Sequence, residues 1–354
     1  MTVARSRRSR RLLRVAVAPI AVASAAGGMA ASASASTQRA QALTPVAIEL
    51  ALVPPKMIFM GFYVAKSEGF FRRNGLNVQL LAQPTGNQAI RGVAAGEGVF
   101  AAGGGDAVAA SDLHGANLQV IWTYGVDDLS LIGVKSIHSV SDLPGHTIGV
   151  TDKSGPSYTM PVIAMQKAGV NPSKANYVIL GGRPALVGAL VNGQIQAAAF
   201  HVDDGLNVLS KDPSLHVIAQ MSQVAPSFLY GPLAVSKPYA AHHKKVVQEV
   251  LTSLIEAQRW MYSHSSATIA LAITDTQEPP AVVRGAYRIL TKNHDWVQNA
   301  GTMSKATVNY TLRVFKSVGV IDRLIPYSTF VAPQYASTVL KQIGTVKCGT
   351  TLCP

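Results

Sequence analysis

The residues best suited to hold a ligand lie in a loop that follows a predicted strand. Lys153, Ser154, Ser157 and Tyr158 come after the apolar segment 147–151 and before an apolar helical pattern. Parallel α/β sheets bind ligands at the carboxyl ends of their strands, where helix N-termini present backbone N–H groups. Hydroxyls and free amides at a helix start suit a carboxylate, a sulfonate or the polar edge of a ring. Alternatively, Ser157 caps the helix, which stabilises it by about 1 kcal/mol; the two roles are compatible.

Glycine-rich turns supply further candidates, because glycine lets the backbone approach a ligand closely. Phe59 and Met60 follow the first predicted strand, Gly86 lies in the turn before a helix, and Gly104 and Asp106 follow the third strand. Asp106 either binds a ligand donor or caps the next helix. These segments lack the Gly-x-x-x-x-Gly-Lys-[Ser/Thr] pattern of a phosphate loop, so they do not indicate a nucleotide site.

Arg183 is the best-placed cation for an anionic ligand. It follows a Gly-Gly turn at 181–182, and a guanidinium binds planar anions through two parallel hydrogen bonds. The alternative is a solvated surface arginine. Together with Lys153, Arg183 favours an anion as ligand.

Alternating strands and helices must position these residues. The pattern predicts strands at 46–53, 76–81 and 99–102, and helices at 63–71 and 87–95. Strand–helix–strand units at this spacing indicate parallel α/β sheets with right-handed crossovers.

A short repeat indicates two similarly built lobes. The pattern Gly-[Glu/Gln]-x-x-x-Ala-Ala occurs at 96–102 and again at 193–199. Each copy follows a helix that itself follows a strand and a glycine turn. The alternative is a chance repetition in a sequence rich in alanine and glycine.

The C-terminal third is predicted to be helical. Apolar residues recur at helical spacing over 247–255 and over 308–318, and Ser304 and Gly319 suit the two ends of the second helix. We expect both apolar stripes to pack against the first lobe.

Six segments carry a resemblance to a known family: 62–71 (FYVAKSEGFF), 74–78 (NGLNV), 140–145 (VSDLPG), 146–150 (HTIGV), 168–170 (AGV) and 189–194 (ALVNGQ). Over residues 46–265 the chain resembles the solute-binding proteins of ABC importers, in the family of nitrate, sulfonate and taurine binders and thiamine-pyrimidine-precursor binders. The resemblance implies an α/β chain with a two-lobed periplasmic binding protein type II fold, in which parallel-rich sheets are flanked by helices and the ligand cleft lies between the lobes. Lobe 1 is then expected over 45–131 plus 232–345, lobe 2 over 132–231, and a tail over 346–354.

This division assigns further residues to the cleft. Trp122 and Tyr124 lie at the expected crossing between lobes and Tyr230 at the return crossing, where their rings either stack on a planar ligand or belong to the core. His201 and Asp203 follow a predicted strand and so face the cleft. His201 is expected to be a hydrogen-bonding or a surface residue, and no metal site is indicated because further ligands cannot be placed.

The implied function is non-catalytic. The protein would capture a small organic ligand, namely a sulfonate, a nitrate-like anion or a planar heterocycle, close its lobes and deliver the ligand to an ABC permease and its ATPase. We expect a monomer without a cofactor. The alternative is an enzyme of the same fold that acts on a pyrimidine or menaquinone precursor. The cysteine cluster of the pyrimidine synthases is absent, and Ser157 does not lie in a Gly-x-Ser-x-Gly elbow.

The N-terminus is typical of an export signal. A cationic stretch at 5–14 precedes an apolar stretch at 15–26, and small residues at 31–42 offer cleavage sites. We therefore expect a signal peptide over 1–44 and a periplasmic or secreted protein. Arg10 and Arg11 resemble the twin-arginine signature, but a general secretory signal explains the same pattern. The apolar stretch is well short of the roughly 20 residues that span a membrane.

Cysteine usage and charge agree with export. Cys348 and Cys353 lie near the C-terminus, where an exported protein is expected to join them as a disulfide. The net charge is +13, but seven arginines precede Pro45 and the rest of the chain carries an excess of only six basic residues. So weak a charge, with no basic stripe interleaved with aromatic residues, argues against nucleic-acid binding.

Overall fold

A computed structural model describes residues 42–153 and 155–353. The chain divides into two units, residues 1–40 and residues 41–354, and the description concerns the second. Except for its last three residues, the expected signal peptide lies outside the described residues, as does Ser154. None of the helices in the described ranges has the length and apolar character needed to cross a membrane.

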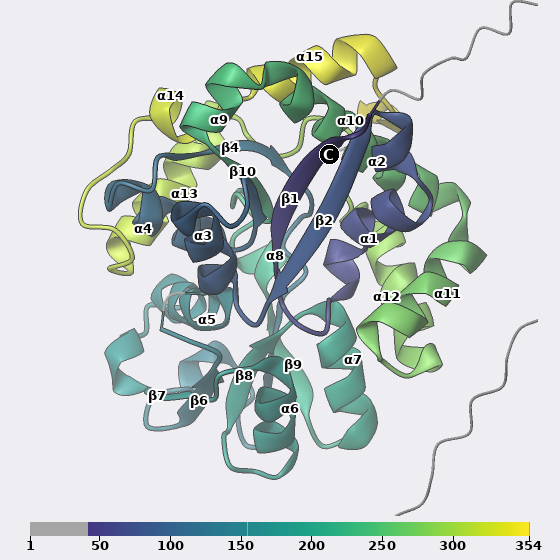
Figure 1. Cartoon of the computed structure of the whole chain (residues 1–354). Coiled ribbons are helices and arrows are strands. Elements are labelled where there is room, and N and C mark those ends of the chain that lie inside the picture. The colour runs from purple at the N-terminus through teal and green to yellow at the C-terminus, as the bar shows by residue number, and fades with distance from the viewer. Residues whose placement is uncertain (1–41, 154, 354) are drawn as a thin grey trace, which may run out of the picture. The chain divides into compact units, whose positions relative to one another are not determined.

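The first of two five-stranded sheets defines lobe 1 (Figure 1). Its order is β2-β1-β3-β10-β4, and its strands are β1 (Thr44–Ala51), β2 (Leu76–Gln83), β3 (Phe100–Ala102), β4 (Leu118–Thr123) and β10 (Pro232–Ser236). β1 is parallel to β2 and β3, whereas β10 runs antiparallel to β3 and β4. The helices between these strands are η1 (Met57–Phe59), α1 (Met60–Ser67), α2 (Phe70–Arg73), α3 (Gly86–Ala95) and α4 (Gly105–Leu113).

The second sheet defines lobe 2 and has the order β7-β6-β8-β5-β9. Its strands are β5 (Ser130–Gly133), β6 (Thr147–Val150), β7 (Asn176–Ile179), β8 (Ala197–Phe200) and β9 (His216–Gln220). β6 is parallel to β7 and β8, whereas β5 runs antiparallel to β8 and β9. Its helices are η2 (Val140–Asp142), α5 (Pro156–Lys167), η3 (Pro172–Lys174), α6 (Arg183–Val191), α7 (Val202–Lys211) and α8 (Met221–Val224).

The two sheets repeat one topology. In each, the second strand in the order lies between two parallel neighbours, and the fourth strand is antiparallel to both of its neighbours. Gly96 ends α3 with φ 83° before β3, and Gly193 follows α6 with φ 68° before β8, so the two copies of the glycine pattern occupy equivalent places. A left-handed backbone at this point requires glycine or strains another residue.

Two segments connect the sheets. Residues 124–129 lead from β4 to β5, and residues 225–231 return from α8 to β10. They run side by side, because the Tyr124 amide donates a hydrogen bond to the Gly231 carbonyl at 2.7 Å. The second sheet begins at Ser130, two residues before the boundary expected from the sequence.

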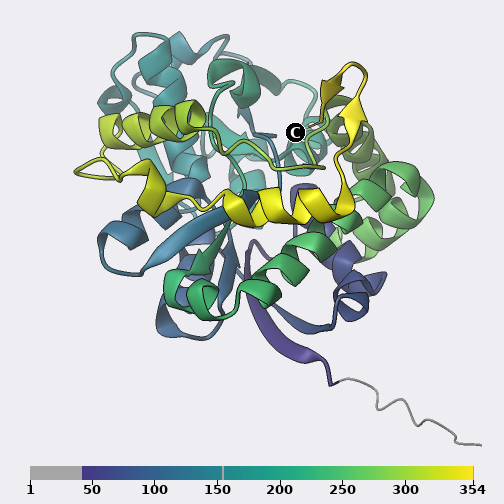
Figure 2. The ribbon, with the colours of Figure 1, turned by 90° about the horizontal axis from the view of Figure 1, so that it is seen from above.

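Most helices of the C-terminal third pack on lobe 1. The helices of this third are α9 (Lys237–His242), α10 (Lys244–Ser263), α11 (Ser265–Thr276), α12 (Pro280–Asn293), α13 (Lys305–Ser317), α14 (Tyr327–Phe330) and α15 (Gln334–Ile343). Of these, however, α12 packs against α7 of lobe 2, and α13 also contacts α5. The predicted stripe of α10 is buried against α1, α2 and α15, and Figure 2 shows α10 and α15 side by side. Ser304 caps α13 by accepting a hydrogen bond from the Thr307 amide, and Gly319 follows that helix with φ 76°. Burying each large aliphatic side chain stabilises the fold by about 1.5–3 kcal/mol.

The chain ends in a short hairpin of β11 (Lys347–Cys348) and β12 (Thr351–Leu352). Cys348 and Cys353 form a disulfide across it. Asn299 also holds this tail, because its side-chain amide donates to the carbonyls of Val346 and Cys353.

Candidate ligand-binding site

A small cavity of about 30 Å³ lies between the lobes. It adjoins the carboxyl ends of β1 and β3 in lobe 1 and of β6 and β8 in lobe 2, as expected for parallel strands. Its lining consists of Ala51, Leu52, Phe59, Thr85, Gly86, Gly103, Gly104, Tyr124, Thr151, Asp152, Gly155, Pro156, Ser157, Arg183, His201 and Tyr230.

Glycine allows helix N-termini to meet at the cavity. Gly104 and Gly155 are the N-caps of α4 and α5, and Gly86 is the first residue of α3. A Cβ atom at Gly104 would lie 2.9 Å from Cδ of Pro156 in lobe 2, and one at Gly86 would lie 3.1 Å from the Gly104 amide nitrogen. The N-termini of α3, α4 and α5 therefore converge, and the partial positive charge of a helix N-terminus favours an anion.

Arg183 brings a full positive charge to the same cavity. It is only 5% exposed, its Nη1 donates to the Ala199 carbonyl at 2.7 Å, and its Nε has no hydrogen-bond partner. None of the ion pairs formed by the described residues includes it. A buried charge is unfavourable unless it is paired. Arg183 is therefore suited to pair with an anion that enters the cavity, whose lining also includes Asp152.

Hydroxyl groups lie near Arg183, but not in the predicted arrangement. Ser157 does not cap α5, because Gly155 occupies that place and Ser157 is the second residue of the helix. Its Oγ instead accepts a hydrogen bond from the Thr151 amide at 2.9 Å and lies 2.8 Å from Thr151 Oγ1. Burial raises the pKa of Tyr230, so its hydroxyl stays protonated and can donate.

Aromatic rings form another part of the cavity lining. The ring of Phe59 lies 5.0 Å from that of Tyr124 and 6.3 Å from that of His201, and His201 lies 6.5 Å from Tyr230. His201 is held by Asp128, whose Oδ1 is 2.8 Å from Nδ1 of the imidazole. Because Phe59 comes from lobe 1 and His201 from lobe 2, this part of the lining forms only when the lobes approach.

Polar contacts hold the lobes together around the cavity. Asp106 of α4 accepts a hydrogen bond from Thr159 of α5 at 3.1 Å, and Asn87 of α3 donates to Asp152 at 3.0 Å. Burial raises the pKa of Asp106 to about 7, although hydrogen bonds from Ala107 and Thr159 oppose the shift. Its carboxyl group therefore changes charge near neutral pH.

A cluster of buried charges, here called the latch, lies beside the cavity and consists of Lys56, Asp203, Asp204 and Glu278. Lys56 lies 2.7 Å from Asp204 of lobe 2 and 3.2 Å from Glu278. Asp203 accepts a hydrogen bond from the Met57 amide at 3.2 Å. Burial lowers the pKa of Lys56, but the surrounding carboxylates outweigh this effect and raise it, so Lys56 stays charged.

The structure brings eight of the predicted residues to the cavity: Phe59, Gly86, Gly104, Tyr124, Ser157, Arg183, His201 and Tyr230. Five others lie elsewhere. Met60 and Trp122 are buried in the core, where the Trp122 indole donates to the Asn299 carbonyl, and Tyr158 packs edge-on against Tyr177. Asp106 and Asp203 join the lobes without lining the cavity. Asp106 is not the N-cap of α4, because Gly104 is.

Eight lining residues were not predicted. They all lie at strand ends or helix starts: Ala51, Leu52, Thr85, Gly103, Thr151, Asp152, Gly155 and Pro156. The rule that ligands lie at the carboxyl ends of strands points to these segments, but among the eight only Asp152 carries a charged side chain.

Comparison with known proteins agrees with this fold. The alkanesulfonate-binding protein SsuA from Xanthomonas axonopodis pv. citri, bound to MOPS, is similar with a TM-score of 0.69 and 18% identity, over 82% of this chain and 98% of that one. The periplasmic nitrate-binding protein NrtA from Synechocystis PCC 6803 is similar with a TM-score of 0.71 and 9% identity, over 85% and 89%. The desulfurization enzyme DSZB is similar with a TM-score of 0.61 and 11% identity, over 85% and 99%. No curated protein matches the sequence.

These similarities confirm the predicted α/β fold of a two-lobed periplasmic binding protein, with mixed, parallel-rich sheets flanked by helices. The family model described as NMT1/THI5 like matches residues 56–267, more than half of the sequence. The chain belongs to the NMT1/THI5-like family.

Proposed function

We propose that this protein is an extracytoplasmic solute-binding protein that captures a small organic anion for an ABC importer. The observation that carries the proposal is the buried guanidinium of Arg183, which has no carboxylate partner among the described residues and faces a cavity between two lobes. An anion there would neutralise Arg183 and contact both lobes, so its binding would favour the closed arrangement.

The chemistry of the lining supports a small oxyanion group. Three helix N-termini and the Tyr230 hydroxyl supply donors around Arg183, and such donors suit a compact oxyanion group such as a sulfonate or nitrate. The rings of Phe59, Tyr124 and His201 support an additional planar or apolar portion. Solved structures of similar fold include sulfonate-binding and nitrate-binding proteins.

Isothermal titration calorimetry with alkanesulfonates, nitrate and thiamine-pyrimidine precursors tests the proposal. We expect one anion to bind with one-to-one stoichiometry. Because Arg183→Gln removes the charge-assisted hydrogen bonds, it should weaken binding by about tenfold or more, whereas Arg183→Lys should retain part of the affinity. Arg284→Gln, at an exposed position of α12, is the matched control. Equal affinity of the Arg183→Gln and Arg284→Gln variants would refute the role of Arg183.

An enzyme is the second candidate, because DSZB has a similar fold. The two functions differ in the fate of the ligand. We propose that the ligand leaves unchanged, which mass spectrometry of the ligand recovered after prolonged incubation would test. Conversion of a bound sulfonate, or of a pyrimidine or menaquinone precursor, would favour the enzyme.

Export and partners complete the proposal. We propose that residues 1–44 are a signal peptide and that the exported chain acts as a monomer, with a membrane permease and an ATPase, in the nitrate/sulfonate/taurine group of importers. The N-terminal sequence of the protein recovered outside the cytoplasm would locate the cleavage site, and substituting Arg10 and Arg11 with lysine would distinguish twin-arginine export from general secretion.

A further inference from the structure

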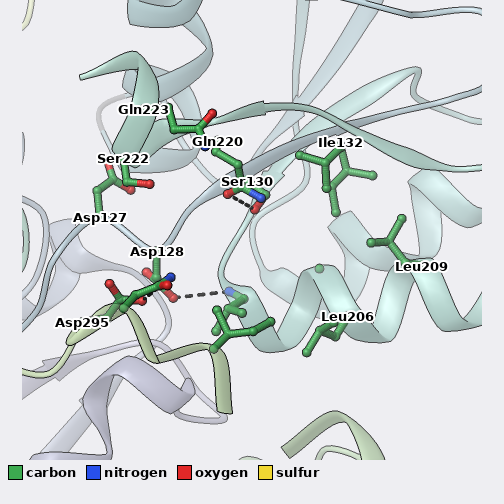
Figure 3. Close-up of a pocket in the computed structure, with 15 residues that line it drawn as sticks. Asp127, Asp128, Ser130, Ile132, Leu206, Leu209, Gln220, Ser222, Gln223 and Asp295 are labelled. Atoms are coloured by element: carbon green, nitrogen blue, oxygen red, sulfur yellow. Dashed lines mark hydrogen bonds between the residues drawn. The ribbon is translucent and has the colours of Figure 1, made fainter. Parts of the chain in front are cut away.

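A second pocket of about 300 Å³ lies beside the segment that crosses between the lobes (Figure 3). The crossing segment contributes Asp127 and Asp128, lobe 2 contributes α7, α8, β5 and β9, and Asp295 follows α12. This pocket shares a wall with the small cavity that Arg183 lines, here called the anion cavity. Asp128 lines the pocket, His201 lines the anion cavity, and the two side chains are hydrogen-bonded at 2.8 Å.

One end of this pocket is acidic. Asp127 is 4% exposed and its Oδ2 has no hydrogen-bond partner, while Oδ1 accepts from the Leu129 amide. Asp295 is also buried, and over residues 42–153 and 155–353 neither it nor Asp127 takes part in an ion pair. Burial raises the pKa of Asp127 well above its ordinary value and that of Asp295 to about 7, and the nearby carboxylate of Asp128 adds to both shifts. A cation that binds here would displace the protons and pair with the carboxylates.

The other end is apolar. Leu206 and Leu209 of α7 face Ile132 of β5 in Figure 3, and Ile289 of α12 also lines the pocket. A ligand that fills the pocket would therefore need a charged head and a short hydrocarbon tail. The volume of about 300 Å³ lies at the lower end of the range for small-molecule sites.

The acidic end does not suit a single metal ion. Within the described residues, the only group of three His, Cys, Asp or Glu side chains with ligand atoms close enough for one ion is His294, Cys348 and Cys353, which excludes the pocket carboxylates. An ammonium group carries three donors that can reach separate acceptors.

We propose that this pocket binds a primary alkylammonium ion, with its head at Asp127 and Asp295 and its tail between α7 and α12. This proposal does not require that the proposed function be correct, although the pocket shares a wall with the anion cavity.

Calorimetry with n-butylammonium chloride tests the proposal. Methylammonium chloride lacks the hydrocarbon tail, n-butanol lacks the charge, and sodium chloride supplies a cation without a tail. We expect saturable one-to-one binding of n-butylammonium in the millimolar range or tighter, with affinity rising about fourfold per added methylene from methyl to butyl. n-Butanol and sodium should bind far more weakly. Heat from n-butylammonium no greater than that from sodium at equal concentration would overturn the proposal.

Two variants locate the site. Asp295→Asn keeps the size of the side chain and should weaken n-butylammonium binding by about tenfold, because a hydrogen bond to a charged group is lost. Ile289→Ala should weaken n-butylammonium binding and leave methylammonium binding unchanged, since only the tail contacts Ile289. Thermal melting shows whether each variant is folded. If both folded variants bind n-butylammonium like the original protein, the ion binds elsewhere and the proposal is wrong.

Discussion

Asp106 carries a carboxyl group that titrates near neutral pH at the junction of the lobes. It is 1% exposed, and burial raises its pKa from 3.8 to about 7. The folded protein therefore holds a proton at Asp106 that the unfolded chain has already released between about pH 4 and pH 7. Over this range Asp106 makes the free energy of unfolding decrease as the pH rises.

Asp106→Asn should remove this dependence, because asparagine is neutral at every pH and can still bond to the Ala107 amide and the Thr159 hydroxyl. Relative to the original protein, the variant should gain stability as the pH rises from 5 to 8, by at most about 3 kcal/mol, since about two pH units of this range lie below the folded pKa of about 7 and each corresponds to about 1.4 kcal/mol. Urea unfolding at several pH values measures the difference. Asp322→Asn, at an exposed position, is the control. If the free energy of unfolding depends on pH in the same way in the original protein and in both variants, the pKa of Asp106 is not raised.

Residue types predicted about half of the residues that line the cavity. Arg183, Ser157 and the glycines could be found because the loops after strands can be located from apolar patterns. Trp122 and Met60 could not be assigned correctly, since both faces of their elements are apolar and the partner of Trp122 is Asn299, 177 residues further along the chain. The cap predicted at Ser157 belongs to Gly155 because the helix begins at Pro156, and proline is favoured at the first position of a helix.

At the scale of elements, α7 is the part of lobe 2 that holds lobe 1. Its first turn places Asp203 and Asp204 against Lys56, which is 2% exposed, and its Asn207 donates to Glu278 at 2.7 Å. Sequence patterns gave no indication of the latch, because Lys56 and Glu278 are 222 residues apart. The composition of the sequence and the spacing of its apolar residues do not show which acidic side chain pairs with which basic side chain in the folded protein.

Lys56→Met should weaken the closed arrangement. It leaves the carboxylates of Asp204 and Glu278 buried without a cation, and breaking a buried ion pair from one side costs about 3–5 kcal/mol. We expect a lower free energy of unfolding in urea at pH 7.5, partly restored in the double variant Lys56→Met/Asp204→Asn. Lys245→Met is the matched control, because Lys245 pairs with Glu249 at the surface with its side chain 83% exposed, and such pairs contribute at most about 1 kcal/mol. Similar losses in the Lys56 and Lys245 variants would show that the latch does not stabilise the protein.

At the scale of the whole molecule, the repeated glycine pattern correctly predicted that the two lobes are built alike. Gly96 and Gly193 end equivalent helices before equivalent strands, so local turn chemistry was enough to indicate two lobes of one topology. The way in which the lobes meet was not predictable, because it depends on close approach between residues far apart in sequence. Gly104 and Pro156 illustrate this point, since they are neighbours only across the cavity.

Gly104→Ala therefore tests closure of the two lobes. The φ of Gly104 is −74°, which alanine adopts without strain, so the substitution acts mainly through its Cβ. This atom would meet Oδ1 of Asp106 in the same lobe and, at 2.9 Å, Cδ of Pro156 in lobe 2. Overpacking of this kind costs about 1–3 kcal/mol, so affinity for the anion should fall by about tenfold while the melting temperature changes little. Small-angle scattering should also show a larger radius of gyration in the presence of ligand. Gly188→Ala is the control, because a Cβ there has no neighbour within 4 Å. If the Gly104→Ala and Gly188→Ala variants have the same affinity for the anion and the same radius of gyration with ligand, the lobes do not close through the contact between Gly104 and Pro156.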